Sequence, residues 1–315
     1  MTMPTRRIGT LEVSVVGLGC NNFGGRIDAA RTTEVVDAAL EAGITFFDTA
    51  DIYGGTRSEE LLGRALGSRR DDVVVATKFG MPVDDTRRGA RPAYVRQALE
   101  DSLRRLGTDH VELYQLHAPD PETPIADTLA ALDEQVRAGK VRQIGCSNFT
   151  AEQLRAAHEA VADGAARFVS VQNEYSILHR RPEDEVLPEC ERSGTVFIPY
   201  YPLARGLLTG KYRRGEAPPS GTRLAGIDSE QYGRLASEEN LRAVEALTNL
   251  AEKQGRSVVE LAIAWLLARP AVSSVIAGAT SASQVAANAR AADWTLSAGE
   301  LAEIDAVVAP GAARV

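Results

Sequence analysis

Short runs of β-branched and aromatic residues alternate with longer amphipathic stretches along the whole chain. Runs this short are typical of buried parallel strands, and the stretches between them space their apolar residues three or four positions apart, as helices do. The alternation favours successive β-α units around a parallel sheet over separate helical and strand-rich blocks. Eight strands are predicted, at Val13–Leu18, Ile44–Phe47, Val73–Thr77, Val111–Leu116, Val141–Cys146, Phe168–Val171, Val196–Pro199 and Ser274–Ile276.

Eight strand-helix units in 315 residues indicate an α/β fold of the (β/α)8 TIM-barrel type, whose strands all end at one functional face. We expect a single barrel domain over residues 1–315, with extra helices towards the C-terminus and a frayed end at Ala309–Val315. A hairpin that pairs Arg6–Ile8 with Val13 onward, turning at Gly9, is expected to close the bottom of the barrel.

Capping residues mark several predicted helices. In a capping box, a Ser or Thr and the Glu or Gln three residues later satisfy free backbone N–H groups reciprocally. Thr123 followed by Pro124 predicts another helix start, with proline as the first helical residue. The segment Val258–Leu267 is apolar on nearly all sides, which predicts a deeply buried helix around Trp265. The capping-box pairs are Thr150 with Gln153, Ser257 with Glu260, Ser281 with Gln284, and Ser297 with Glu300.

The longest segment without clear periodicity runs from Gly206 to Gly233, after the seventh predicted strand. A long irregular segment in a compact domain is usually functional or mobile. We therefore expect this insertion to fold over a bound ligand.

Charge and composition narrow the range of partners. The formal net charge is −8 and the basic residues are dispersed, so nucleic acid is not expected as a partner. No apolar stretch approaches the roughly 20 residues of a membrane span, and no signal peptide is visible, so we expect no membrane partner and a cytoplasmic protein. Cys20, Cys146 and Cys190 are expected as reduced thiols, and the histidines lack the spacing of a metal site.

Four polar residues stand at the ends of three predicted strands or just beyond: Asp48, Tyr53, Lys78 and His117. Singly, each has an ordinary interpretation, as a turn cap, a packing residue, a solvated strand end or a buried histidine. Neighbouring barrel strands nevertheless bring their ends together on one rim, so the four are expected to be close in space. A carboxylate, a phenol, an ammonium and an imidazole together suit proton donation to a carbonyl oxygen.

The phenol is the expected proton donor. Tyrosine is protonated at neutral pH because its unperturbed pKa is about 10. The Lys78 ammonium close by is expected to lower the pKa of Tyr53 and ease proton release. Asp48 would keep Lys78 charged and in place, and His117 would hydrogen-bond the substrate oxygen.

Two further regions bear on ligand binding. Glycines at 17, 19, 24 and 25 do not fit a dinucleotide-binding loop, because G-x-G-x-x-G from Gly17 needs glycine at Asn22; a flexible loop with Asn22 and Phe23 facing the substrate is preferred. Near the C-terminus, Gly278, Thr280 and Ser281 lead into a capped helix, which is either a phosphate site or an ordinary serine cap.

At these positions the chain resembles the aldo-keto reductase superfamily. The motifs follow the family order over essentially the whole length: DTADIYG around Asp48 and Tyr53, TKFG around Lys78, QLHAPD around His117, then GCSNF, QNEYS, YYPLARGLLTGKY and IAGATSASQVAANA. The resemblance implies a barrel that binds NADP(H), or less often NAD(H), in an extended form. It also implies that Tyr53 is the general acid or base, tuned by Lys78 and Asp48, and that His117 helps to place the carbonyl.

The resemblance implies cofactor contacts as well. Ser147, Asn148 and Gln172 would hold the nicotinamide carboxamide, and Tyr200 would stack on the ring. Leu203, Gly206 and Leu208 would contact the pyrophosphate through their backbone, and Gln284 and Asn288 would lie near the adenosine. Residues Ala277 to Ala289 contain no Lys or Arg to pair with a 2′-phosphate, and Gln284 stands where many relatives have arginine. NADP(H) remains slightly favoured on family frequency, with NAD(H) as the alternative.

The expected activity is NAD(P)H-dependent reduction of a small aldehyde or ketone, or oxidation of the corresponding alcohol. One alternative is an NAD-dependent sugar dehydrogenase, and the other is a non-catalytic, cofactor-binding channel subunit; no docking tail is expected, because the chain begins almost directly at the hairpin. Substrate selectivity is expected to depend on loops around Asn22, Met81, Tyr114, Phe149 and Tyr201.

Overall fold

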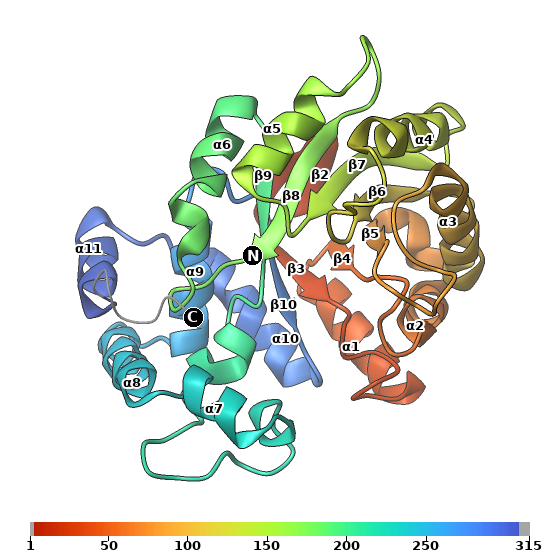
Figure 1. Cartoon of the computed structure of the whole chain (residues 1–315). Helices are drawn as coiled ribbons and strands as arrows, with labels where there is room; N and C mark the ends of the chain where they lie inside the picture. Colours follow the sequence, from red (N-terminus) through yellow and green to blue (C-terminus); the bar gives the residue numbers. More distant parts are fainter. Residues whose placement is uncertain (1–2, 309–315) are drawn as a thin grey trace.

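A computed structural model describes residues 3–308, and in it eight parallel strands form a barrel surrounded by helices (Figure 1). The strands pair in the order β10-β3-β4-β5-β6-β7-β8-β9. The expected (β/α)8 fold is confirmed. The barrel strands are β3 (Val16–Gly19), β4 (Phe46–Asp48), β5 (Val74–Phe79), β6 (Val111–Leu116), β7 (Val141–Ser147), β8 (Phe168–Glu174), β9 (Val196–Tyr200) and β10 (Val275–Gly278).

The barrel closes between its last two strands. A parallel bridge joins Phe197 of β9 to Val272, just before β10, and Ser273 donates its backbone N–H to the Phe197 carbonyl at 3.1 Å. Because both ends of the sheet meet, no long strand edge is left unpaired.

The N-terminal hairpin consists of β1 (Thr5–Ile8) and β2 (Leu11–Ser14), with Gly9 at a φ of 58°. Ile8 and Val13 pack into the barrel interior, so the hairpin closes one end of the barrel as expected. The predicted strand Val13–Leu18 was wrong as one unit. It is divided between β2 and β3, because the chain leaves the hairpin after Ser14 before it enters the barrel.

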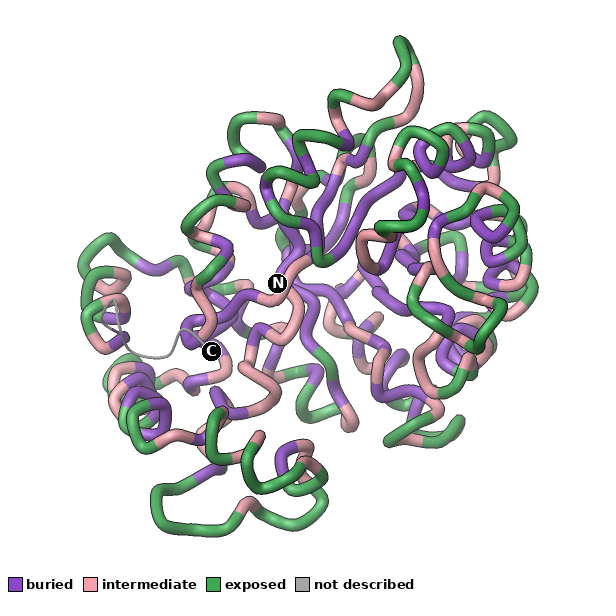
Figure 2. Tube along the Cα trace, viewed as in Figure 1, coloured by how far each residue is buried: buried purple, intermediate pink, exposed green. Residues whose placement is uncertain are grey.

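The helices cover the outside of the barrel, and buried positions concentrate on the strands and on the helix faces towards them (Figure 2). Helix α9 is nearly all buried, including Trp265, as predicted. The helices are α1 (Ala29–Glu41), α2 (Arg57–Leu66), α3 (Pro92–Leu106), α4 (Ile125–Arg137), α5 (Ala151–Glu159), α6 (Val186–Ser193), α7 (Ser229–Leu235), α8 (Glu238–Lys253), α9 (Val258–Leu267), α10 (Ala282–Ala289) and α11 (Ala298–Val307).

Three predicted capping boxes are confirmed, at the starts of α5, α9 and α11. The fourth is only half formed. Ser281 caps α10 by accepting from the Gln284 N–H, but the Gln284 side chain accepts from the Thr280 N–H instead of closing the box. At α4, Pro124 is the N-cap and not the first helical residue.

The insertion 206–233 is less irregular than its sequence suggested. It contains short 3-10 turns, η3 (Ala204–Thr209) at its start and η4 (Leu224–Gly226) further on, and most of α7. The predicted frayed end Ala309–Val315 lies outside the described residues. None of the helices within residues 3–308 has both the length and the apolar character needed to cross a membrane.

Candidate active site

Strand alternation explains why charged side chains enter the barrel. Phe46 of β4 and Ala76 of β5 point into the interior together. Successive side chains of a strand face opposite sides of the sheet, so the residues two positions further along point inwards again. Those residues are Asp48 and Lys78, which lie one layer nearer the carboxyl ends of the strands.

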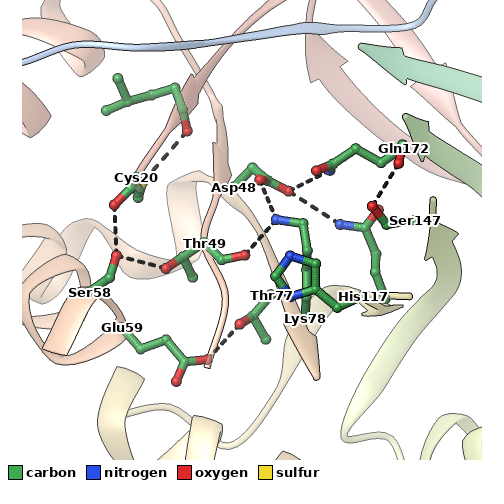
Figure 3. Close-up of polar contacts among 12 residues, drawn as sticks. Cys20, Asp48, Thr49, Ser58, Glu59, Thr77, Lys78, His117, Ser147 and Gln172 are labelled. Atoms are coloured by element: carbon green, nitrogen blue, oxygen red, sulfur yellow. Dashed lines mark hydrogen bonds and ion pairs between the residues drawn. The ribbon is translucent and has the colours of Figure 1, made fainter. Parts of the chain in front are cut away.

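Lys78 and Asp48 form a fully buried ion pair (Figure 3). The Lys78 ammonium donates to Asp48 Oδ1 at 2.5 Å and to the Thr49 carbonyl at 2.8 Å. Burial alone would lower the pKa of Lys78, but Asp48 and Tyr53 outweigh burial and raise it above its usual value. Lys78 therefore stays charged at neutral pH, as expected from the sequence.

The second oxygen of Asp48 is also occupied. Gln172 Nε2 donates to Asp48 Oδ2 at 2.9 Å, and Gln115 Nε2 donates to it at 3.2 Å. The backbone carbonyl of Gln172 accepts from the Ser147 hydroxyl at 2.7 Å (Figure 3). Strands from across the barrel thus fix the carboxylate. The sequence had given no role to Gln115, whose only signal was its inward position in β6.

Tyr53 lies on the loop between β4 and α2, beside Lys78. The Lys78 ammonium is 5.1 Å from the Tyr53 ring centroid, near enough to act on the charge of the phenol. Burial raises the pKa of Tyr53, Lys78 lowers it, and Asp48 raises it further, so the net shift is upward. Lys78 acts in the expected direction, but the expected net lowering was wrong because burial outweighs it. The phenol is therefore held in its protonated form.

His117 follows β6 and faces Tyr53, with ring centroids 5.7 Å apart at an angle of 77°. Burial first and the positive charge of Lys78 second lower the pKa of His117 to about 3. The imidazole is therefore neutral at physiological pH. Its Nδ1 is buried without a hydrogen-bond partner among residues 3–308.

A cavity of about 740 Å³ opens beside these residues, which is within the usual size of a ligand site. Asp48, Tyr53 and His117 line it, whereas Lys78 lies just behind the surface at 0% exposure. The candidate cofactor contacts that line it are Ser147, Asn148, Gln172, Tyr200, Leu203, Gly206, Gly278, Thr280, Gln284 and Asn288.

Two candidate cofactor residues do not line this cavity. Leu208 is fully buried in an irregular turn, and Ser281 turns its hydroxyl to Ser283 and to the start of α10. The geometry at Ser281 matches the ordinary interpretation as a helix cap.

The expected substrate loops also need correction. Phe23, Tyr114 and Phe149 are buried in the hydrophobic core, and Tyr114 stacks on Phe79 with centroids 4.7 Å apart. Asn22 and Tyr201 line the cavity. Met81 is partly exposed and does not line it.

Four cationic side chains in the cavity lining were missed by the sequence analysis: Arg26, Arg205, Lys211 and Arg223. Asp48 is the only carboxylate among the lining residues, and Lys78 already neutralises it. Arg205 has a loose ion pair with Glu174 at 3.6 Å. Within the described chain the other three have no ion pair. An uncompensated positive lining in an acidic protein favours an anionic ligand.

The insertion reaches across the cavity to the loop after β3. Arg223 donates to Asn22 Oδ1 at 3.0 Å, and Arg26 donates to the Gly221 carbonyl at 2.9 Å. These contacts join residues about two hundred positions apart, which is why local sequence patterns did not reveal them. The insertion therefore lies over the cavity, as expected.

The lining fits a nicotinamide dinucleotide in its chemistry. Amide and hydroxyl groups of Ser147, Asn148 and Gln172 lie beside Tyr53 and the ring of Tyr200, and the Tyr200 hydroxyl donates to Asn148 Oδ1 at 2.8 Å. The uncompensated cations suit its phosphates. An α/β barrel with a protonated phenol, a neutral imidazole and a buried ammonium at one cavity can donate a proton to a bound oxygen.

Comparison with known proteins finds similarity over nearly the whole chain. A model of the aldo/keto reductase family matches residues 15–309. An aldo-keto reductase of Bacillus subtilis, YhdN, is 36% identical over 307 residues, which cover 95% of this chain and 91% of the relative. A probable voltage-gated potassium channel subunit beta of Oryza sativa is 36% identical over 297 residues, covering 90% and 88%.

A solved structure agrees with these similarities. The glycerol dehydrogenase of Gluconobacter oxydans superposes with a TM-score of 0.85 at 32% identity, covering 98% of this chain and 96% of that one.

Proposed function

The chain belongs to the aldo/keto reductase family and is an oxidoreductase of carbonyl and alcohol groups, and on this premise we propose that it reduces aldehydes or ketones with Tyr53 as the proton donor. The observation that carries the proposal is that the Tyr53 phenol lies close to both the buried Lys78 ammonium and the neutral imidazole of His117. Reduction of a carbonyl generates negative charge on its oxygen, and these groups meet that charge.

Tyr53 gives its proton to the substrate oxygen. Its raised pKa keeps the proton in place until the oxygen becomes basic, and the Lys78 ammonium stabilises the phenolate that remains. Asp48 contributes by holding Lys78, whose ammonium also donates to the Thr49 carbonyl. The same groups run in reverse when an alcohol is oxidised.

His117 orients the substrate oxygen. Because its pKa is lowered to about 3, it acts as a neutral hydrogen-bond donor and not as a second acid. Asn148 supports this position by donating from Nδ2 to the His117 carbonyl at 2.9 Å.

The cofactor is a nicotinamide dinucleotide, which supplies the hydride when bound. Ser147, Asn148 and Gln172 would hold its carboxamide, and Tyr200 would pack against its ring. Lys211 would pair with the diphosphate next to Gly206; a Cβ built on that glycine would lie 3.8 Å from Lys211 Nζ. Arg223 would cover the same region from the insertion.

We favour NADP(H) over NAD(H) as the cofactor. The loop after β10 has no cation, but Arg26, Lys211 and Arg223 bring positive charge to the cavity from other loops. Lys211 and Arg223 would act on the diphosphate of either cofactor, so the preference rests on Arg26, whose charge would favour a third phosphate group. Initial rates with NADPH and with NADH at equal concentration test this choice, and a higher kcat/KM with NADH would reject it.

The proton-donor role is tested by the Tyr53→Phe variant. We expect kcat to fall by about a thousandfold, the usual range for loss of a general acid, while the dissociation constant of the cofactor stays nearly unchanged. Tyr232→Phe is a matched control, because Tyr232 lies on α7 away from the cavity lining. Retention of most carbonyl reduction by Tyr53→Phe would remove Tyr53 from this role.

Two other functions have specific support. The similarity to probable potassium channel β subunits favours a cofactor-binding subunit, which would show no multiple turnover on a generic aldehyde. The similarity to a glycerol dehydrogenase, together with the absence of a cation in the loop after β10, favours an NAD-dependent sugar or polyol dehydrogenase. Rates of polyol oxidation and aldehyde reduction, measured with both cofactors, separate these possibilities.

A further inference from the structure

Asp51 is a buried carboxyl group outside the catalytic set, two residues before Tyr53. Its residue exposure is 2%, and neither carboxyl oxygen has a hydrogen-bond partner of regular geometry within residues 3–308. The backbone N–H of Ile52 is near enough to lower the carboxyl pKa, but it does not offset burial. A buried carboxylate without partners is costly, so this group has a reason to stay protonated.

The surroundings of Asp51 favour the same state. Glu59 on α2 is fully buried, and its carboxylate accepts from Thr77 at 2.5 Å (Figure 3) and from Arg105 of α3 at 2.7 Å. Arg105 is thus already engaged by Glu59 and is only partly available to Asp51. The other groups that act on or respond to the Asp51 charge are Lys78 of β5, Tyr94 of α3 and Tyr114 of β6.

These groups set the protonation state. Burial first and the negative charge of Glu59 second raise the pKa of Asp51 to about 7, against the lowering effects of Arg105 and Lys78. The Tyr114 hydroxyl in the same compartment is also buried without a partner in the described part of the chain. A neutral carboxylic acid without a partner costs less in this buried site than a carboxylate, which adds a second negative charge beside Glu59.

Asp51 is joined directly to the catalytic loop. Its backbone N–H donates to the Lys78 carbonyl at 3.1 Å, and the Tyr53 N–H donates to the Ala50 carbonyl at 3.2 Å. On the far side of the loop, the Ser58 N–H donates to the Tyr53 carbonyl at 3.1 Å. The loop is therefore a tight turn against β5, and a displacement at Asp51 moves the backbone that carries the phenol.

We propose that Asp51 is a positioning residue that acts as a neutral carboxylic acid, holding the Tyr53 loop against β5 and α2, and that loss of its proton loosens this loop. The proposal rests on the proposed role of Tyr53. It adds a protonation equilibrium at Asp51 that controls the position of the Tyr53 loop. This proton is separate from the one that Tyr53 gives to the substrate. Asp51 itself does not line the cavity.

The test is the pH dependence of carbonyl reduction in a single turnover, with NADPH bound beforehand and a generic aldehyde as substrate. For the wild-type protein we expect the rate to fall about tenfold from pH 6 to pH 8, because the protonated share of a group with a pKa of about 7 falls by that factor. Asp51→Asn keeps the shape and stays neutral, so its rate should remain within about twofold over this range.

A second readout uses the protein alone. A raised folded-state pKa of an acid means that stability is lost as pH rises from the unfolded pKa towards the folded one. The thermal midpoint of the wild type should therefore fall relative to that of Asp51→Asn between pH 5 and pH 8. Glu59→Gln removes the neighbouring charge and should move the wild-type rate decrease to lower pH.

The outcomes are distinct. If Asp51→Asn keeps the wild-type decrease in rate and the same relative thermal midpoint at every pH, the proposal is overturned. If Asp51→Asn does not fold, the thermal and kinetic pH profiles of Glu59→Gln decide, and an unchanged midpoint of the rate decrease rejects the proposal. Activity of Tyr53→Phe would instead show that the proposed function has failed, whatever Asp51 does.

Discussion

Two buried ion pairs stand at opposite ends of the same part of the barrel. Lys78 and Asp48 meet near the carboxyl ends of β5 and β4, whereas Arg70, on the 3-10 turn η1 (Gly67–Asp72) before β5, pairs with Glu112 at the start of β6. Arg70 makes two contacts with Glu112, at 2.9 and 3.2 Å, and also donates to the carbonyls of Val73 and His110.

The difference lies in what surrounds each pair. Arg70 is fixed by four acceptors of its own neighbourhood, and neither it nor Glu112 lines the large cavity. Lys78 and Asp48 lie beside that cavity and beside two groups that can exchange or share a proton, Tyr53 and His117. Burial of an ion pair is therefore not in itself a sign of function. What indicates function is the position of the pair beside groups that line the cavity and can give or accept a proton.

The largest expected effect comes from removing the cation of the Lys78–Asp48 pair. Lys78→Met keeps the length of the side chain and leaves Tyr53 without its ammonium. We expect kcat to fall by about a hundredfold or more, since the phenolate formed on proton donation loses its stabilising charge. Steady-state reduction of a generic aldehyde measures this, with circular dichroism as a check on folding. Near-wild-type turnover would contradict a role for the Lys78–Asp48 pair in catalysis.

Substitution of His117 tests whether the groups beside the Lys78–Asp48 pair have the protonation states that the site requires. His117→Gln keeps a neutral donor in a different geometry, and we expect a loss of about tenfold to a hundredfold in kcat. Because the pKa of His117 is lowered to about 3, the folded state resists protonation, and stability is lost as pH falls below about 6.5. Between pH 6.5 and 5, the unfolding free energy of the wild type should therefore fall by about 1–2 kcal/mol relative to His117→Gln. Urea denaturation at both pH values provides the measurement, and equal pH slopes would show that the imidazole is not held neutral by the fold.

Removing the cation of the Arg70–Glu112 pair should have the smallest effect on turnover. Arg70→Met leaves Glu112 buried with one fewer cation, and we expect the unfolding free energy to fall by about 3 kcal/mol. The kcat of the folded variant should stay within about twofold of the wild type. Urea unfolding and aldehyde reduction on the same preparation test both statements. A large loss of kcat in a fully folded Arg70→Met protein would erase the distinction between the two ends.

The barrel was predictable because its determinants are local. Alternation of short apolar runs with amphipathic segments identified the eight strands, and capping residues such as Thr150 and Ser257 marked helix starts correctly. The boundary between β2 and β3 was missed, because the apolar run Val13–Leu18 is continuous while the chain changes direction within it. No local signal distinguishes a hairpin residue that plugs the barrel from a barrel residue.

The candidate site was only partly predictable for a related reason. The positions of Asp48, Lys78 and His117 follow from strand order, since each lies at or close to the carboxyl end of one of three neighbouring strands. The position of Arg223 in the cavity lining depends instead on how a long insertion crosses the barrel to reach Asn22. The net pKa shift of Tyr53 depends on burial, which spacing does not reveal.

The central claim is that Lys78 works through the Tyr53 proton. A double-variant comparison tests it most directly, with single-turnover reduction rates for the wild type, Tyr53→Phe, Lys78→Met and the combined variant. If the ammonium acts only by tuning the phenol, the combined variant should be within about threefold of Tyr53→Phe alone, because the second change removes nothing further. If the two losses multiply instead, the two side chains act independently and the account is contradicted.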